Sequence, residues 1–125
     1  MDGKVFQRIY EELEPVLPPQ WRKVVLRACY TEGSYSIKYY AAGPDEKFVD
    51  CYQLPGINKM QLIKIFSGIN KVLVEERKSL TGKDIWSVLT MVFDDSGAFK
   101  TDFYYGDISE TFLAFQEAWE KQYLN

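Results

Sequence analysis

The sequence predicts an α+β fold in one domain over residues 1–125, with an antiparallel sheet of about five strands packed with three helices. The length suits one domain, and 46% hydrophobic and 16% aromatic residues are enough to bury a core. Pairs of segments with period-two apolar alternation are separated by turns, and segments of helical period lie before, between and after them. The expected order is therefore α-β-β-(β)-α-β-β-α.

The first element is an amphipathic helix that ends at a group of prolines. Its apolar residues recur at spacings of three and four, which places them on one helix face: Val5, Phe6, Ile9, Tyr10, Leu13 and Val16. Pro15, Pro18 and Pro19 end the helix, because proline lacks a backbone N–H and clashes with the preceding turn.

A hairpin follows, because the apolar period changes to two at Trp21. Its first strand alternates as if buried mainly on one face: Val24, Leu26, Ala28 and Tyr30 against Val25, Arg27 and Cys29. After a turn at 31–33, the second strand covers residues 35–40. Its alternation directs Tyr35, Ile37 and Tyr39 inward and Ser36, Lys38 and Tyr40 outward.

A short third strand at 47–52 precedes the longest predicted helix. Asn58 can cap that helix, and Gln61 three residues later completes a capping box. The following apolar residues have helical spacing: Leu62, Ile63, Phe66, Ile69, Val72 and Leu73. The helix ends near residues 79–82.

The second hairpin pairs a strand at 86–93, apolar on both faces, with one at 98–105. Residues 94–97, Asp-Asp-Ser-Gly, form the turn between them. The last helix starts at Ser109 and directs three aromatic residues inward: Phe112, Phe115 and Trp119. Four further aromatic residues are expected in the core: Trp21, Trp86, Phe99 and Phe103. Strand parity places Tyr40 and Tyr104 on outward faces, where they are exposed or covered by a helix.

Several classes of chemistry are excluded by the composition. The chain has no histidine, which rules out Ser-His-Asp and Cys-His catalysis and His-ligated zinc. Cys29 and Cys51 lack the CxxC spacing of redox and zinc motifs, and their apolar neighbours favour buried thiols in a reducing compartment. No signal peptide or membrane span is recognisable, so we expect a cytoplasmic protein that does not bind membranes.

No residues form a recognisable catalytic or cofactor site, and the expectation is a protein without enzymatic activity, cofactor or metal. Asp94 and Asp95 could together bind a divalent cation, since hard cations prefer carboxylate oxygen. A hairpin turn explains the same two residues and is the favoured interpretation.

Charge is unevenly distributed along the chain, whose net charge is −3. Residues 1–80 contain twelve Lys and Arg against ten Asp and Glu, whereas residues 81–125 contain three Lys against eight Asp and Glu. The net charges are therefore +2 and −5. An acidic C-terminal third attracts a basic partner or keeps a solvated face soluble, and it argues against direct nucleic-acid binding.

Several short motifs recur here in an order that resembles the YezG-like immunity protein family, over about residues 5–124. They include Pro18-Pro19-Gln20-Trp21, Trp86-Ser87-Val88-Leu89-Thr90, Asp102-Phe103-Tyr104-Tyr105 and the terminal Trp119-Glu120-Lys121-Gln122-Tyr123-Leu124. The resemblance implies a cytoplasmic antitoxin that binds and neutralises the C-terminal nuclease domain of an LXG-type polymorphic toxin. It implies no catalytic residues.

From this resemblance and the acidic C-terminal third we expect a surface that contacts Lys and Arg of the toxin. Its expected charged residues are Asp94, Asp95, Asp102, Asp107 and Glu110. Tyr104 and Tyr40 are the expected aromatic contacts.

Two other functions remain open at this point. One is an enzyme or small-ligand binder with a pocket between the sheet and the long helix. The other is a self-associating structural domain with Tyr40 and Tyr104 on a homodimer face, so that the protein is either a monomer or a homodimer.

Overall fold

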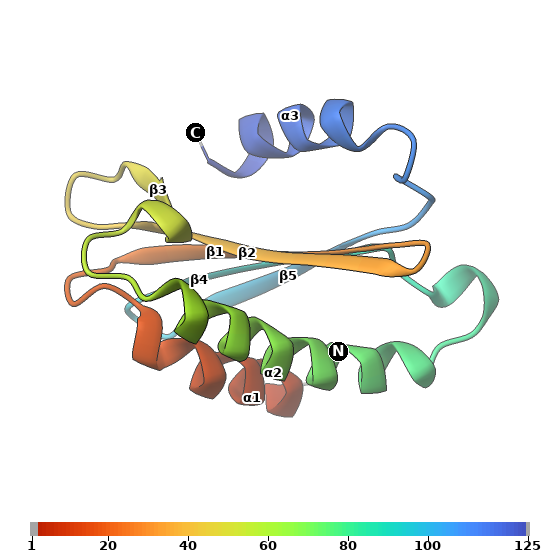
Figure 1. Ribbon diagram of the computed structural model, residues 1–125, viewed down its shortest axis with the longest axis horizontal. Helices are drawn as coiled ribbons and strands as arrows, with labels where there is room; N and C mark the ends of the chain where they lie inside the picture. The colour runs from red at the N-terminus through yellow and green to blue at the C-terminus, as the bar shows by residue number, and fades with distance from the viewer. Residues whose placement is uncertain (1–2, 125) are drawn as a thin grey trace.

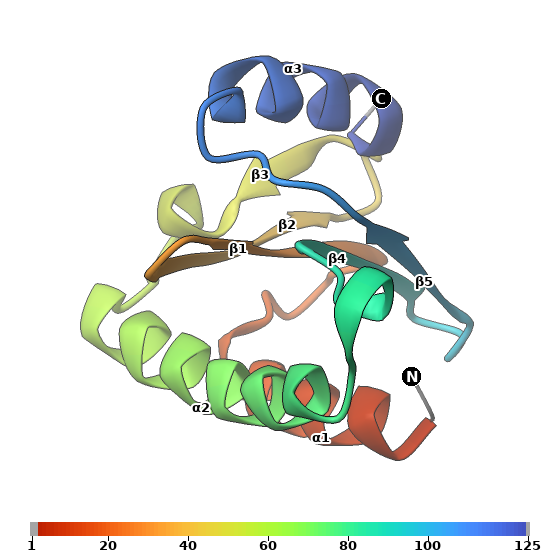
Figure 2. The same cartoon turned by 90° about the vertical axis from the view of Figure 1, so that its right-hand side faces the viewer.

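A computed structural model describes residues 3–124 and shows an antiparallel sheet between two layers of helix (Figures 1 and 2). The strands are β1 (Lys23–Thr31), β2 (Ser34–Ala42), β3 (Phe48–Asp50), β4 (Val88–Asp94) and β5 (Phe99–Tyr104). The helices are α1 (Gly3–Leu13), α2 (Lys59–Lys78) and α3 (Phe112–Tyr123). The predicted fold class and element order are confirmed.

The sheet consists of two hairpins joined side by side, in the strand order β3-β2-β1-β4-β5. Within the first hairpin Val25 pairs with Tyr40, and across the junction it pairs with Val92. In the second hairpin Thr90 pairs with Asp102. This arrangement places β1 in the centre of the sheet and leaves β3 and β5 as its edges.

The main core lies between the sheet and the two helices α1 and α2. Its largest fully buried side chains include Ile9, Leu13, Leu26, Tyr39, Leu62, Ile69, Leu73, Leu89 and Met91. The predicted cap of α2 is confirmed, because the Asn58 side chain accepts a hydrogen bond of 3.1 Å from the Gln61 backbone N–H. The buried apolar side chains of α2 pack in this core, between the helix and the sheet.

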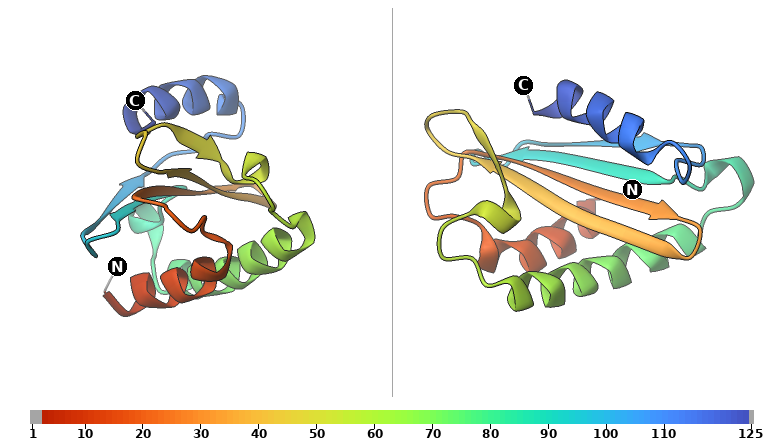
Figure 3. Two further views of the ribbon diagram at one scale, coloured as in Figure 1. Left: turned by 90° about the vertical axis from the view of Figure 1, so that its left-hand side faces the viewer. Right: turned by 45° about the horizontal axis from the view of Figure 1, so that its top comes forward.

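The second face of the sheet carries α3 alone, and Figure 3 shows this helix on the side opposite α1 and α2. Because α3 covers that face, β1 is buried on both of its faces, and residues 24–30 are all buried. The expectation that β1 is buried mainly on one face was therefore wrong. The residues directed toward α3 are Val25, Arg27 and Cys29.

Three further sequence expectations differ from the structure. Phe99 is 48% exposed, because it lies at the start of an edge strand, where its ring stacks on Phe6 at a centroid distance of 4.0 Å. Tyr35 is exposed beside the β1–β2 turn, and Ile63 is exposed on α2. Within residues 3–124, no helix is both long and apolar enough to cross a membrane.

The last helix begins at Phe112, three residues later than the predicted start at Ser109. The Asp107 side chain accepts hydrogen bonds from the Ser109 backbone N–H at 2.9 Å and from its hydroxyl at 2.6 Å. These bonds hold Ser109 in a turn that competes with helix formation. Glu110 therefore lies in the β5–α3 connection and not in the first turn of the helix.

Candidate partner-binding surface

Trp119 attaches α3 to the sheet. It is the one residue of α3 that is buried, at 3% exposure, and its ring lies 5.5 Å from that of Tyr40. The indole N–H donates to the Thr90 hydroxyl at 2.9 Å, so the polar atom of this side chain is satisfied. Leu113 on the same helix is 81% exposed. A groove lies along each side of this helix.

The two grooves have different walls. One lies over β2 and β3 and is lined by Arg27, Ser36, Lys38, Asp50, Gln116 and Glu120, among others. The other lies over β4 and β5 and is lined by residues that include Thr90, Lys100, Asp102, Tyr104, Phe115 and Tyr123. Of the predicted partner-binding residues, Asp102 and Tyr104 line the second groove, whereas Tyr40 lines the first.

Asp94 ends β4 and Asp95 begins the turn of the second hairpin, which confirms the predicted turn. Asp94 Oδ1 accepts hydrogen bonds from the Ser96 hydroxyl at 2.6 Å, from the Ser96 N–H at 3.0 Å and from the Ala98 N–H at 3.2 Å. These bonds, first of all that from the Ser96 hydroxyl, lower the pKa of Asp94 from its ordinary value. The carboxylate is therefore a fixed negative charge at neutral pH.

Asp107 repeats the same arrangement at the far end of β5. Its hydrogen bonds from the Ser109 hydroxyl and N–H lower its pKa as well. Glu110 is exposed three residues later. The turn at Asp94 and the connection at Asp107 are separated by the six residues of β5, which span about 20 Å.

Asp102 and Tyr104 lie between these two ends, on the side of β5 that faces α3. Asp102 Oδ2 accepts a hydrogen bond of 2.8 Å from the Tyr123 hydroxyl and lies 3.6 Å from the Lys100 ammonium group. Burial, followed by this contact with Asp102, raises the pKa of Tyr123 to about 12. Tyr104 is 46% exposed and packs on Phe115 at a centroid distance of 5.0 Å.

Tyr40 differs from the other predicted contact residues because it is only 6% exposed. Its side chain faces away from the main core, as strand parity predicts, but α3 covers it. The structure thus aligns Asp94, Asp95, Asp102, Tyr104, Asp107 and Glu110 along β5 and its two ends, and separates Tyr40 from them. Sequence reasoning also missed Glu117 and Glu120, which are exposed on α3.

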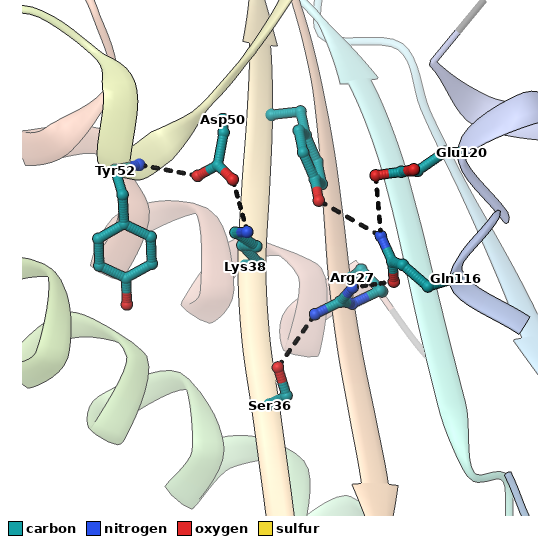
Figure 4. Close-up of polar contacts among 8 residues, drawn as sticks. Arg27, Ser36, Lys38, Asp50, Tyr52, Gln116 and Glu120 are labelled. Atoms are coloured by element: carbon teal, nitrogen blue, oxygen red, sulfur yellow. Dashed lines mark hydrogen bonds and ion pairs between the residues drawn. The ribbon is translucent and has the colours of Figure 1, made fainter. Parts of the chain in front are cut away.

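A polar network around the buried Arg27, beside α3, was also missed (Figure 4). The Arg27 guanidinium donates from Nη1 to the Gln116 side-chain oxygen and from Nη2 to the Ser36 hydroxyl, the latter at 3.0 Å. Next to it, Lys38 Nζ lies 2.5 Å from Asp50 Oδ2. The sequence signal for this network was an arginine in the middle of an apolar strand.

Residues 3–124 hold no group of three or more His, Cys, Asp and Glu side chains arranged to bind a metal ion. The two cysteines are free and buried, and burial raises the pKa of both thiols, to about 11 for Cys51. A raised thiol pKa lowers the fraction of reactive thiolate at neutral pH.

Comparisons with known proteins identify relatives over most of the chain. A family model described as YezG-like, "Immunity protein YezG-like", matches residues 3–125. The chain is 26% identical over 112 residues to a protein named Immunity protein YezG of Bacillus subtilis (strain 168), which covers 83% of this chain and 73% of that protein. It is 25% identical over 114 residues to a protein of the same name from Bacillus spizizenii (strain ATCC 23059 / NRRL B-14472 / W23). This match covers 85% of this chain and 70% of that protein.

Proposed function

The chain belongs to the YezG-like immunity protein family, and from this membership we propose that it binds and neutralises the C-terminal nuclease domain of a cognate LXG-type polymorphic toxin. In this proposal the protein acts in the cytoplasm, without catalysis and without a cofactor. The single observation that supports the immunity role is the family match over residues 3–125. The nuclease partner rests on the resemblance described from the sequence.

The proposed contact surface is the β5 side of the molecule, from the hairpin turn to the β5–α3 connection. A nuclease that binds nucleic-acid phosphates needs Lys and Arg at its substrate groove. Asp94, Asp95, Asp102, Asp107 and Glu110 would oppose such residues, and the exposed Tyr104 would supply an aromatic contact in their midst. By occupying the substrate groove of the nuclease, this surface would exclude the nucleic acid.

The two Asp-Ser turns favour this role because their charges are held in place before binding. Asp94 and Asp107 each use Oδ1 to fix the local backbone, and their lowered pKa keeps them ionised well below neutral pH. A charge that is already fixed loses little conformational freedom on association. Asp102 is less free, since its carboxylate also contacts Tyr123 and Lys100.

We expect the association rate with the toxin nuclease domain encoded beside this gene to fall as salt concentration rises. We also expect Asp107→Lys and Asp102→Lys to lower that rate by several-fold, because they replace attraction with repulsion. Stopped-flow fluorescence at a series of salt concentrations measures both effects. Glu75→Lys is the matched control, since this exposed residue on α2 gives the same change in net charge on the opposite face.

Two outcomes would contradict different parts of the proposal. An association rate that changes neither with salt concentration nor with the two substitutions would overturn the proposed electrostatic surface and leave the immunity role intact. Growth arrest despite co-expression with the neighbouring nuclease domain, together with no co-purifying complex, would overturn the assignment of the partner.

A further inference from the structure

Arg27 carries a buried positive charge with no acidic side chain in direct contact. It is 3% exposed, and among the ion pairs of residues 3–124 none includes it. Its two bonded groups, the Gln116 amide oxygen and the Ser36 hydroxyl, are both neutral. Its Nε is buried with no hydrogen-bond partner among the described residues. A buried charge of this kind is costly, and buried arginines are usually paired with an acid.

Aromatic rings partly compensate the charge of Arg27 but give its Nε–H no hydrogen-bond acceptor. The guanidinium carbon lies 5.7 Å from the centre of the Phe112 ring and 5.8 Å from that of Trp119. Such cation–π contacts stabilise a cation without accepting its N–H hydrogen bonds. The guanidinium therefore retains unused capacity to donate to an anion.

Gln116 contacts this guanidinium where Arg27 lines the groove over β2 and β3. Its side-chain oxygen accepts from Arg27, whereas its nitrogen makes two long hydrogen bonds of 3.4 Å, to the Tyr40 hydroxyl and to Glu120 Oε1 (Figure 4). Gln116 is half-buried on a helix whose only buried residue is Trp119. A rotation of its side chain would free Arg27 Nη1 to donate to a group in the groove.

The charges of the groove favour a carboxylate over a phosphate. Lys38 is already paired with Asp50 at 2.5 Å, and Glu120 also lines the groove, so among the described lining residues Arg27 is the one cation outside an ion pair and has no second free cation beside it to balance a dianion. A carboxylate is planar and matches the guanidinium fork with two parallel hydrogen bonds. Its oxygen is also close in shape to the Gln116 amide oxygen that Arg27 now contacts.

We propose that the groove between α3 and strands β2 and β3 binds a carboxylate, which takes the place of the Gln116 side-chain oxygen on Arg27. The carboxylate is that of a small free acid or of an acidic side chain on a protein partner. The site does not depend on the identity of the toxin.

Acetate titration of the full chain tests the site, with chloride replaced so that ionic strength stays constant. We expect a saturable shift of the Arg27 Nε–Hε signal in nitrogen–proton NMR spectra. Arg27→Met should weaken acetate binding, followed through the backbone amide of Gln116, by about tenfold or more, because it removes the charge-assisted bonds. Arg22→Met is the matched control, since Arg22 is exposed outside the groove and the change in charge is the same.

Gln116→Ala provides a test in the opposite direction, because it removes the neutral amide oxygen that accepts a hydrogen bond from the guanidinium. This variant should bind acetate more tightly than the original chain. Arg27→Lys keeps the charge without the planar fork and should bind more weakly, which keeps the test decisive if Arg27→Met fails to fold. Phosphate at the same ionic strength should bind more weakly than acetate.

The outcomes test separately whether the carboxylate site exists and where its carboxylate comes from. No saturable shift with acetate, or a shift that Gln116→Ala abolishes, would overturn the carboxylate site whatever happens with the toxin. If acetate binds and Arg27→Met also weakens the complex with the toxin nuclease domain, the source is an acidic side chain of that partner. If acetate binds and the complex is unchanged, the source is a small free acid.

Discussion

Tyr39 shows how a single buried polar atom ties two segments of the fold together. The side chain is completely buried, and its hydroxyl donates to the Val16 carbonyl oxygen at 2.5 Å. Val16 ends the short 3-10 helix that follows α1, whereas Tyr39 lies in the middle of β2. This hydrogen bond therefore fixes the chain after α1 against the sheet.

Replacement of Tyr39 by Phe should lower the free energy of unfolding by about 1–3 kcal/mol, because it leaves the buried Val16 carbonyl without its partner. Chemical denaturation measures the change. Tyr35→Phe, at an exposed position of the same strand, should change stability by less than about 0.5 kcal/mol. Equal losses in the two variants would show that the Tyr39 hydroxyl contributes nothing specific.

Tyr40, the neighbour of Tyr39, marks the limit of prediction at the scale of a residue. Strand parity correctly directed the two tyrosines to opposite faces of the sheet. Parity cannot say what covers a face, and here α3 arrives from residues more than 70 positions away in the sequence. The exposure of Tyr40, unlike its direction, therefore depends on tertiary packing.

At the scale of an element, α3 is attached to the sheet mainly by Trp119. The predicted inward residues Phe112 and Phe115 are only half-buried at its start, and its outer surface is exposed. The sequence predicted this helix and its inward aromatic residues, but the side chain of Asp107 delays its start. A local side-chain hydrogen bond outweighed the favourable helix start expected at Ser109.

Trp119→Ala should release α3 while the rest of the fold remains. The loss of a buried tryptophan costs about 3 kcal/mol or more, so amide hydrogens of α3 should exchange on the order of 100-fold faster. Hydrogen exchange with mass spectrometry measures this effect. Amides of β1, β2 and β4 should keep their protection. Leu113→Ala, at the most exposed apolar position of the helix, should leave exchange unchanged, and similar acceleration in both variants would contradict the role of Trp119.

At the scale of the whole molecule, the sheet separates two layers of unequal size. The larger layer contains α1 and α2, and Cys51 lies in its core. The smaller layer contains α3, and Cys29 lies beneath the start of that helix. The sequence predicted both hairpins and all three helices, because each is encoded by local periodicity. Which face each helix covers is decided by contacts between distant segments, and it could not be predicted in the same way.

The two cysteines should report separately on the opening of these layers. At pH 8 burial and the raised pKa of the thiols should make both react slowly with a disulfide reagent. In the variant Cys51→Ala the remaining Cys29 should react faster than Cys51 does in Cys29→Ala, because Cys29 lies in a small cluster under the start of α3 and Cys51 lies in the main core. Addition of Trp119→Ala should accelerate labelling of Cys29 more than that of Cys51. Identical rates in every variant would mean that both thiols react through one global opening.

The pairing of β1 with β4 has a consequence for how the chain folds during synthesis. Each hairpin forms from neighbouring residues, whereas Val25 must find Val92 after all of α2 has been made. Contacts between such distant residues form slowly. Until β4 leaves the ribosome, the edge of β1 that will become the centre of the sheet is open to pairing with another strand. The central pairing of the finished sheet thus closes only after α2 and β4 have been made.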